Sequence, residues 1–317
     1  MKNKRLFFIC TCLVLMSMKQ PSLPPDEIPI TENAIATITL TGYPDFLIAD
    51  GNTVWVTNVN RIDQLKAGSS VPLMSVTIPE PCGAGAVGFG SLWIASCNDK
   101  SIYRIDKNSG EILSIIPTGL ADHFGELSIA VGAGSVWVLS DKEGTLSRID
   151  PETNMVVNYI TVKSGSSCAV FGFGSVWITN DDAGEDRGSV QRIDPIRNRV
   201  VATIPVGPLP HFLAAGEGGV WTLNQGDGTV TRINPETNTA VRTIEVGAKG
   251  SGGDIATGAG KVWVRATKVL LSSIDPATNK VASVYGPPSG SGAVRVTANN
   301  LVWLSAHDVH TVWAIKE

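Results

Sequence analysis

The stretch GAGSVWVLSDKEGTLSRIDPETN, residues 132–154, decides the fold because most of it recurs along the chain. It returns as GFGSVWITN at residues 172–180, before QRIDPIRN, and as GEGGVWTLN at residues 216–224, before TRINPETN. A period of about 20–50 residues is typical of repeat architectures such as solenoids and propellers. Tryptophans mark the copies at intervals of 38 to 44 residues: Trp55, Trp93, Trp137, Trp177, Trp221, Trp263 and Trp303.

Each copy contains the pattern of four short strands. An Ala- and Gly-rich run such as SIAVGAG (128–134) leads through a tight turn into the β-type run that holds the Trp, which predicts a hairpin. A third run ends in Arg-Ile-Asp, with residues 61–63 as the first copy, and a Pro-containing turn leads into a fourth run. Four antiparallel strands in about 42 residues are typical of a propeller blade, and small side chains in the first strand suit crowding about a central axis.

The two ends of the chain complement each other. The last copy stops at HTVWAIKE (310–317), so its fourth strand is missing, while AIATITLTG (34–42) resembles AVRTIEVG (240–247). We therefore expect an all-β, seven-bladed propeller over residues 34–317, in which the amino-terminal strand completes the last blade. Closure of this kind removes a free sheet edge.

The first residues have the features of an export signal. Lys2, Lys4 and Arg5 precede an apolar run over residues 6–18, which is shorter than the roughly 20 residues that span a bilayer. We expect residues 1–19 to be a signal peptide or an amino-terminal anchor, with 20–33 as a linker and a periplasmic or secreted location. Lipidation at a cysteine of the apolar run is a further alternative.

Charge excludes one class of partner. The formal net charge is −4, and loss of residues 1–19 leaves 21 basic and 29 acidic residues. An acidic domain without a basic stripe does not fit nucleic acid. No later segment is a transmembrane candidate, and we expect a monomer.

The motifs G-x-G-x-V-W-V/I, R-I-D-P-x-T-N and V-x-T-I-x-V-G resemble those of YVTN-type and virginiamycin B lyase-like propellers over residues 34–317. The resemblance implies secretion and, for the lyase, catalytic His residues that follow a Pro, with a Glu after the Trp. Pro210-His211 matches the His position. Asn224 stands where the Glu would be, and Ser167 stands where a second His would be.

Pairing across each first hairpin brings particular side chains together at one rim of the channel, because residues equidistant from a turn face each other. Cys82 then faces Cys97, which predicts a disulfide in an exported protein. Cys168 faces Thr179 and is expected to be a small buried thiol.

The same pairing rule predicts which residues at this rim could bind a ligand. His211 faces Asn224, either as a polar pair or as a ligand contact, and Asp254 faces Arg265 as an ion pair that could orient an anion. The full set of candidates is Asp45, Asn58, Asn180, His211, Asn224, Asp254, Arg265 and His307.

A divalent cation is a second expectation. Glu126 faces Asp141, and opposed carboxylates repel unless a proton or a cation lies between them or both turn into water. Asp45, which faces Asn58 in the first copy, could add oxygen ligands, so Ca²⁺, Mg²⁺ or Mn²⁺ could bind here. His307 and His310, in SAHDVH, form a weaker pattern for a transition metal.

These residues support three functions. The favoured one is an exported propeller that binds a small molecule, a glycan or an envelope protein at the mouth of its channel, because no catalytic constellation is complete. The alternative is a metal-assisted lyase or hydrolase, lyase-like or lactonase-like, with His211 or His307 as acid–base. A third is a structural module of an envelope complex. GxSxG, CxxC, P-loop and HExxH motifs are absent from the sequence.

Overall fold

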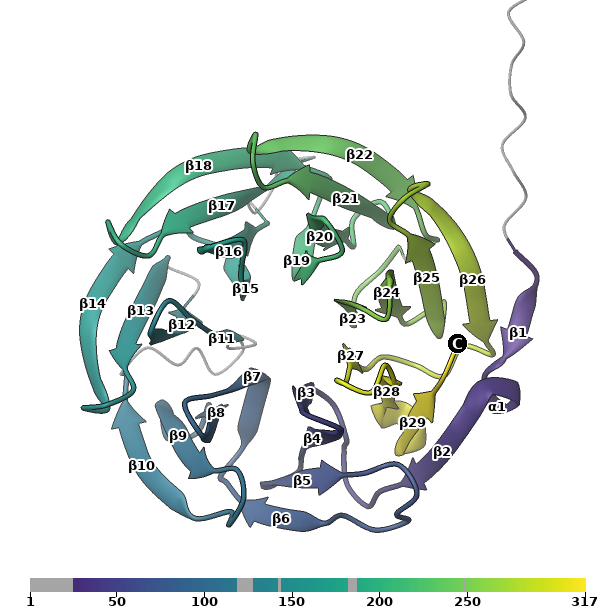
Figure 1. The fold of residues 1–317 in the computed structure, drawn as a ribbon, viewed down its shortest axis with the longest axis horizontal. Coiled ribbons are helices and arrows are strands. Elements are labelled where there is room, and N and C mark those ends of the chain that lie inside the picture. Colours follow the sequence, from purple (N-terminus) through teal and green to yellow (C-terminus); the bar gives the residue numbers. More distant parts are fainter. Residues whose placement is uncertain (1–24, 119–127, 142–143, 182–186, 248) are drawn as a thin grey trace, which may run out of the picture.

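The computed structural model describes residues 25–118, 128–141, 144–181, 187–247 and 249–317. Sheets stand around a central axis in a closed ring, with the first strand of each group innermost (Figure 1). The predicted signal segment lies outside the described residues, and none of the described helices is long and apolar enough to cross a membrane.

Most strands fall into antiparallel groups of four, and we name each group, or blade, by its tryptophan. The Trp55 blade is β3 (Leu47–Asp50), β4 (Thr53–Asn58), β5 (Arg61–Leu65) and β6 (Met74–Thr77). The Trp93 blade is β7 (Pro81–Gly88), β8 (Ser91–Ser96), β9 (Ser101–Asp106) and β10 (Ile112–Pro117). The Trp137 blade is β11 (Ser128–Gly132), β12 (Ser135–Asp141), β13 (Thr145–Asp150) and β14 (Met155–Thr161).

The remaining blades repeat this order. The Trp177 blade is β15 (Ser166–Gly172), β16 (Ser175–Asn180), β17 (Gly188–Asp194) and β18 (Arg199–Val206). The Trp221 blade is β19 (Pro210–Gly216), β20 (Gly219–Asn224), β21 (Thr229–Asn234) and β22 (Thr239–Glu245). The Trp263 blade is β23 (Gly253–Gly258), β24 (Lys261–Ala266), β25 (Leu271–Asp275) and β26 (Lys280–Gly286). The Trp303 blade contains β27 (Val294–Val296), β28 (Val302–Ala306), the 3₁₀ turn η1 (His307–Val309) and β29 (Thr311–Ile315).

The amino-terminal strand closes the ring. β2 (Ala34–Thr39) pairs antiparallel with β29 as the outer strand of the Trp303 blade (Figure 1). The structure thus confirms the all-β propeller class, the four-stranded antiparallel blades and closure by this strand. The end of the expected linker forms β1 (Glu27–Pro29), which pairs parallel with β26, and the short helix α1 (Ile30–Asn33).

The repeated glycine and tryptophan pack the interfaces between blades. Trp137 is fully buried, and its indole N–H donates to the Gly132 carbonyl at 3.0 Å. A Cβ on Gly132 would lie 2.1 Å from the Phe171 ring of the next blade, so only glycine allows this approach. The same indole bond recurs at Trp93, Trp177, Trp221 and Trp263.

The repeated arginine joins each of several blades to the next. The Arg148 guanidinium lies 5.0 Å from the centre of the Trp137 ring, a cation–π contact. Its Nη1 donates to the Pro195 carbonyl at 3.0 Å and to Asn198 Oδ1 at 2.9 Å, both in the turn of the following blade. The equivalent arginines, with the same kind of contacts, are Arg104, Arg192 and Arg232.

The first copy of the Arg-Ile-Asp motif does not align with the others. Trp55 pairs with Gln64, whereas Trp93 pairs with Arg104, so Arg61 is not the equivalent arginine. Arg61 instead bonds to Asp63 of its own strand.

The predicted disulfide between Cys82 and Cys97 is present, although the predicted pairing is wrong. A bulge between Cys82 and Ala86 shifts the strand, so Cys82 lies opposite Ala95. The two cysteine Cα atoms are nevertheless 5.9 Å apart, which is within reach of a disulfide.

Replacing Arg148 with Met should lower the free energy of unfolding by about 2 kcal/mol, because two acceptors in the next blade lose their donor and the cation–π contact is lost. Urea denaturation measures this loss. Arg199→Met, at an exposed position of β18, is the matched control and should change stability by less than about 0.5 kcal/mol. Equal effects of the two variants would contradict the structural role of Arg148.

Reduction of the disulfide should lower the free energy of unfolding by about 3 kcal/mol, since the bond closes a loop with a sequence separation of 15. Urea unfolding with and without dithiothreitol measures this. The Cys82→Ser/Cys97→Ser double variant should match the reduced protein and not respond to the reductant. A response of that variant would show that another thiol is involved.

Candidate functional site

The innermost strands line a cavity of about 260 Å³ on the central axis, which is open to solvent. Its wall consists mostly of small and aliphatic side chains, as expected for strands crowded about an axis. Among the described lining residues, polar side-chain atoms come from Ser128, Cys168, Thr257 and Arg295. This cavity is the site that the fold builds at its centre.

Arg295 is the one charged side chain among the described residues that line this wall, and it was not predicted from the sequence. It pairs across the strands with Trp303, a position that holds Ala214 and Ala256 in the two preceding blades. Alignment of the copies on the residue opposite the Trp would have shown an arginine among small and aliphatic residues.

Asp254 holds the Arg295 side chain by an ion pair with Nη1. Asp254 is 2% exposed and also accepts hydrogen bonds from the backbone N–H groups of Ile255 and Val294. Burial raises the pKa of the Asp254 carboxyl, and Arg295 opposes that shift. The guanidinium therefore sits in a fixed orientation at the cavity wall.

Asp254 and Arg265 lie opposite each other as predicted, but the expected ion pair between them is absent. Arg265 is fully buried and donates instead to the Ser305 carbonyl at 3.1 Å and to the Ala266 carbonyl. Burial lowers the pKa of Arg265 to about 10, and the nearby Asp308 and Asp45 carboxylates oppose this shift.

The three candidate asparagines have structural roles. Each is at most 4% exposed, and each side chain bonds to its own blade or to the segment that leads into it. Asn58, for example, accepts from the backbone N–H of Tyr43 at 2.7 Å and donates to the Thr41 carbonyl at 3.0 Å. The other two bond as follows: Asn180 to Ser164 and Ser166, and Asn224 to Thr229 and Thr231.

Bulges displace two of the predicted pairs. Pro210, not His211, lies opposite Asn224, because the register shifts between Pro210 and Phe212. His211 contacts the Phe212 ring edge-on at 4.8 Å, and its carbonyl accepts from Thr179. Asp45 and Phe46 both bond to Thr57, so Asp45 does not lie directly opposite Asn58. Cys168, beside Thr179 as expected, is buried, which raises the pKa of its thiol to about 11.

Three of the candidate residues lie where the last blades meet the first: Asp45, Arg265 and His307. The Ser305 hydroxyl donates to the Asp45 carbonyl at 2.5 Å, while the Ser305 carbonyl accepts from Arg265. His307 bonds through Nδ1 to Asp308 and stacks on the Tyr43 ring, with ring centres 4.1 Å apart. The Tyr43 hydroxyl is 3.1 Å from His307 Nε2, but in stacked rings it lies over the imidazole rather than in its plane. His310 bonds through Nδ1 to the Gly42 carbonyl.

The predicted cation site involves Glu126, which lies outside the described residues, and Asp141, of whose side chain nothing is described. Within the described ranges, no three His, Cys, Asp or Glu side chains form a group suited to a metal ion.

Comparison with solved structures identifies the same fold elsewhere. A streptogramin B lyase structure superimposes with a TM-score of 0.70 and 15% identity, covering 89% of this chain and 96% of that one. Hydrazine synthase of Kuenenia stuttgartiensis gives a TM-score of 0.72 and 13% identity, covering 88% and 97%. The chain shares their fold. At these identities the likeness concerns architecture alone, and it supports the motif-based resemblance to lyase-like propellers at that level. No protein-family model matches the chain, and no curated protein does.

Replacing Arg295 with Met should lower the free energy of unfolding by about 3 kcal/mol at pH 8, because Asp254 then remains buried and charged without its partner. The raised pKa of Asp254 means that the folded state binds its proton more tightly than the unfolded state. Its contribution to stability is therefore largest below the ordinary Asp pKa and is lost as the pH rises through the folded pKa.

The loss in free energy of unfolding caused by Arg295→Met should accordingly become smaller as the pH falls from 8 towards 4, because Asp254 then becomes neutral. Urea unfolding across this range measures the trend. The double variant Arg295→Met/Asp254→Asn is the control. Its difference from the wild type in free energy of unfolding should depend little on pH, because position 254 then carries no titratable group. A deficit that stays constant or grows on acidification would contradict the assignment.

Proposed function

We propose that the chain is an exported binding propeller that holds a small molecule in the cavity of its central channel. The observation that carries the proposal is the open cavity of about 260 Å³ with an oriented arginine in a wall of small and aliphatic side chains. Ligand sites in proteins are typically concave and mostly apolar, with a few fixed polar groups that set orientation.

Arg295 suggests the chemistry of the ligand. Asp254 engages Nη1, and the rest of the guanidinium carries further N–H donors. A ligand with an apolar body and a carboxylate, or another strong acceptor, would use these donors and the aliphatic wall together. The pre-formed ion pair reduces the cost of ordering the side chain when the ligand binds.

The candidate catalytic residues fit binding better than turnover. Asn224 occupies the slot of the family's Glu, and the hydroxyls of its own blade engage its side-chain amide. His211 projects from a bulge beside Phe212. Export is supported by the Cys82–Cys97 disulfide, because such bonds persist in oxidising compartments.

Thermal unfolding with a ligand panel tests the proposal. The panel pairs benzoate and hexanoate with the neutral benzyl alcohol and hexanol, and adds CaCl₂, MgCl₂ and MnCl₂. We expect at least one carboxylate to raise the melting temperature more than its alcohol does, with a gain of about 2.7 kcal/mol at a hundredfold excess over Kd.

Ala214→Phe fills the cavity and should abolish this rise. Ala240→Phe, on the exposed strand β22, is the matched control and should retain it. The proposal fails if no carboxylate shifts the wild-type transition, or if the filled variant responds as the wild type does. A rise with the metal salts alone would favour the metal-assisted alternative.

A further inference from the structure

Two phenylalanines stand exposed at the tips of inner hairpin turns. Phe89 and Phe173 are 43% and 44% exposed, with φ angles of 54° and 51°. A bulky side chain at positive φ is uncommon, and strained conformations of this kind cluster at functional sites. The corresponding turns of two other blades hold Ala133 and Ala259, also at positive φ, so the turn does not require an aromatic residue.

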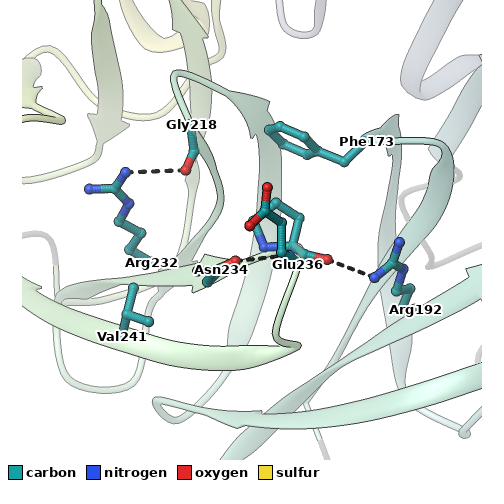
Figure 2. A pocket seen from close by; sticks show the side chains of 8 residues that line it. Phe173, Arg192, Gly218, Arg232, Asn234, Glu236 and Val241 are labelled. Carbon is teal, nitrogen blue, oxygen red and sulfur yellow. Dashed lines mark hydrogen bonds between the residues drawn. The ribbon is translucent and has the colours of Figure 1, made fainter.

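Each phenylalanine overlooks a groove between its blade and the next. The groove at Phe173 has a volume of about 550 Å³ and also contains Arg192, Arg232 and Glu236 (Figure 2). The groove at Phe89 has a volume of about 460 Å³ and the same kinds of residue: Arg104, Asp150, Pro151 and Glu152.

Phenylalanine and glutamate occur together in these grooves. The equivalent positions between the Trp137 and Trp177 blades are Ala133 and Ile196, and those between the Trp221 and Trp263 blades are Glu217 and Ala277. The arginine and the turn proline are present in all four places, because they join the blades. The aromatic–acid pair is therefore an addition to that framework rather than part of it.

The polar groups of the Phe173 groove are held in place. Arg192 donates from Nε to Ser175 and from Nη1 to the Pro235 carbonyl at 2.7 Å, and its guanidinium stacks on Trp177. The Glu236 backbone N–H donates to Asn234 Oδ1 at 2.8 Å, which fixes the turn. Figure 2 shows the Glu236 carboxylate directed into the space between Phe173 and Gly218.

We propose that each of these two grooves binds one sugar unit of a carbohydrate chain. The exposed phenyl face offers a platform for the C–H face of a pyranose ring, and the neighbouring carboxylate and guanidinium offer an acceptor and donors for its hydroxyl groups. Two equivalent grooves on one rim would bind a polymer more tightly than a single unit, since the second contact becomes intramolecular. These grooves are separate from the central cavity, so the inference goes beyond the function proposed above.

Isothermal titration calorimetry with four defined tetrasaccharides tests the proposal: chitotetraose, cellotetraose, maltotetraose and mannotetraose. We expect at least one to bind the wild type at two sites per chain. Phe89→Ala and Phe173→Ala should each weaken one of the two sites by at least about tenfold, and the double variant should weaken both. Glu152→Gln/Glu236→Gln should weaken it as well, because the strong acceptors are lost.

Matched variants separate this result from folding and from the cavity. Alanine occurs naturally at Ala133 in the same conformation, so the phenylalanine variants should unfold at the wild-type temperature. Ala214→Phe, which fills the cavity, should leave carbohydrate binding unchanged. The proposal is overturned if none of the four tetrasaccharides binds, or if binding persists unchanged in the double phenylalanine variant.

Discussion

Four successive interfaces between blades depend on an arginine that belongs to one blade and bonds to the next. Its guanidinium stacks on the buried Trp of its own blade and donates to the Pro and Asn of the following turn, as Arg148 does. One planar cation thereby satisfies acceptors in a neighbouring sheet and covers an aromatic face. Where this arginine is missing, other ion pairs connect the same regions: Lys107 with Asp50, and Lys261 with Glu317.

The architecture was predictable because each copy repeats the same local pattern. Several blades contain equivalents of Gly132, Trp137 and Arg148. They recur because these interfaces need close approach of the strands, a buried ring and a donor to the next turn. The missing last strand and the matching segment at residues 34–42 gave the closure. These features depend on short-range spacing, which a single sequence displays directly.

The side-chain pairs at the rim were less predictable, since counting residues outward from a hairpin turn assumes that the two strands pair without a bulge. Bulges after Pro210 and Cys82 each shift the partners at the strand end where the candidate residues lie. Cys82 and Cys97 still meet, because a diagonal neighbour remains within reach of a disulfide. Asp254 pairs with Arg295 across an interface between blades, a contact that the hairpin pattern does not contain. Arg295 itself could have been found by aligning the copies on the residue opposite the Trp.

Closure by β2 and β29 also fixes an order of events during synthesis. The strand over residues 34–39 leaves the ribosome well before its partner over residues 311–315 has been made. β2 must therefore remain without its native neighbour until residues 311–315 have been made, and the two strands are very far apart along the chain. Such pairings form late and slowly. The disc can therefore close only after all the blades between these two strands have been synthesised.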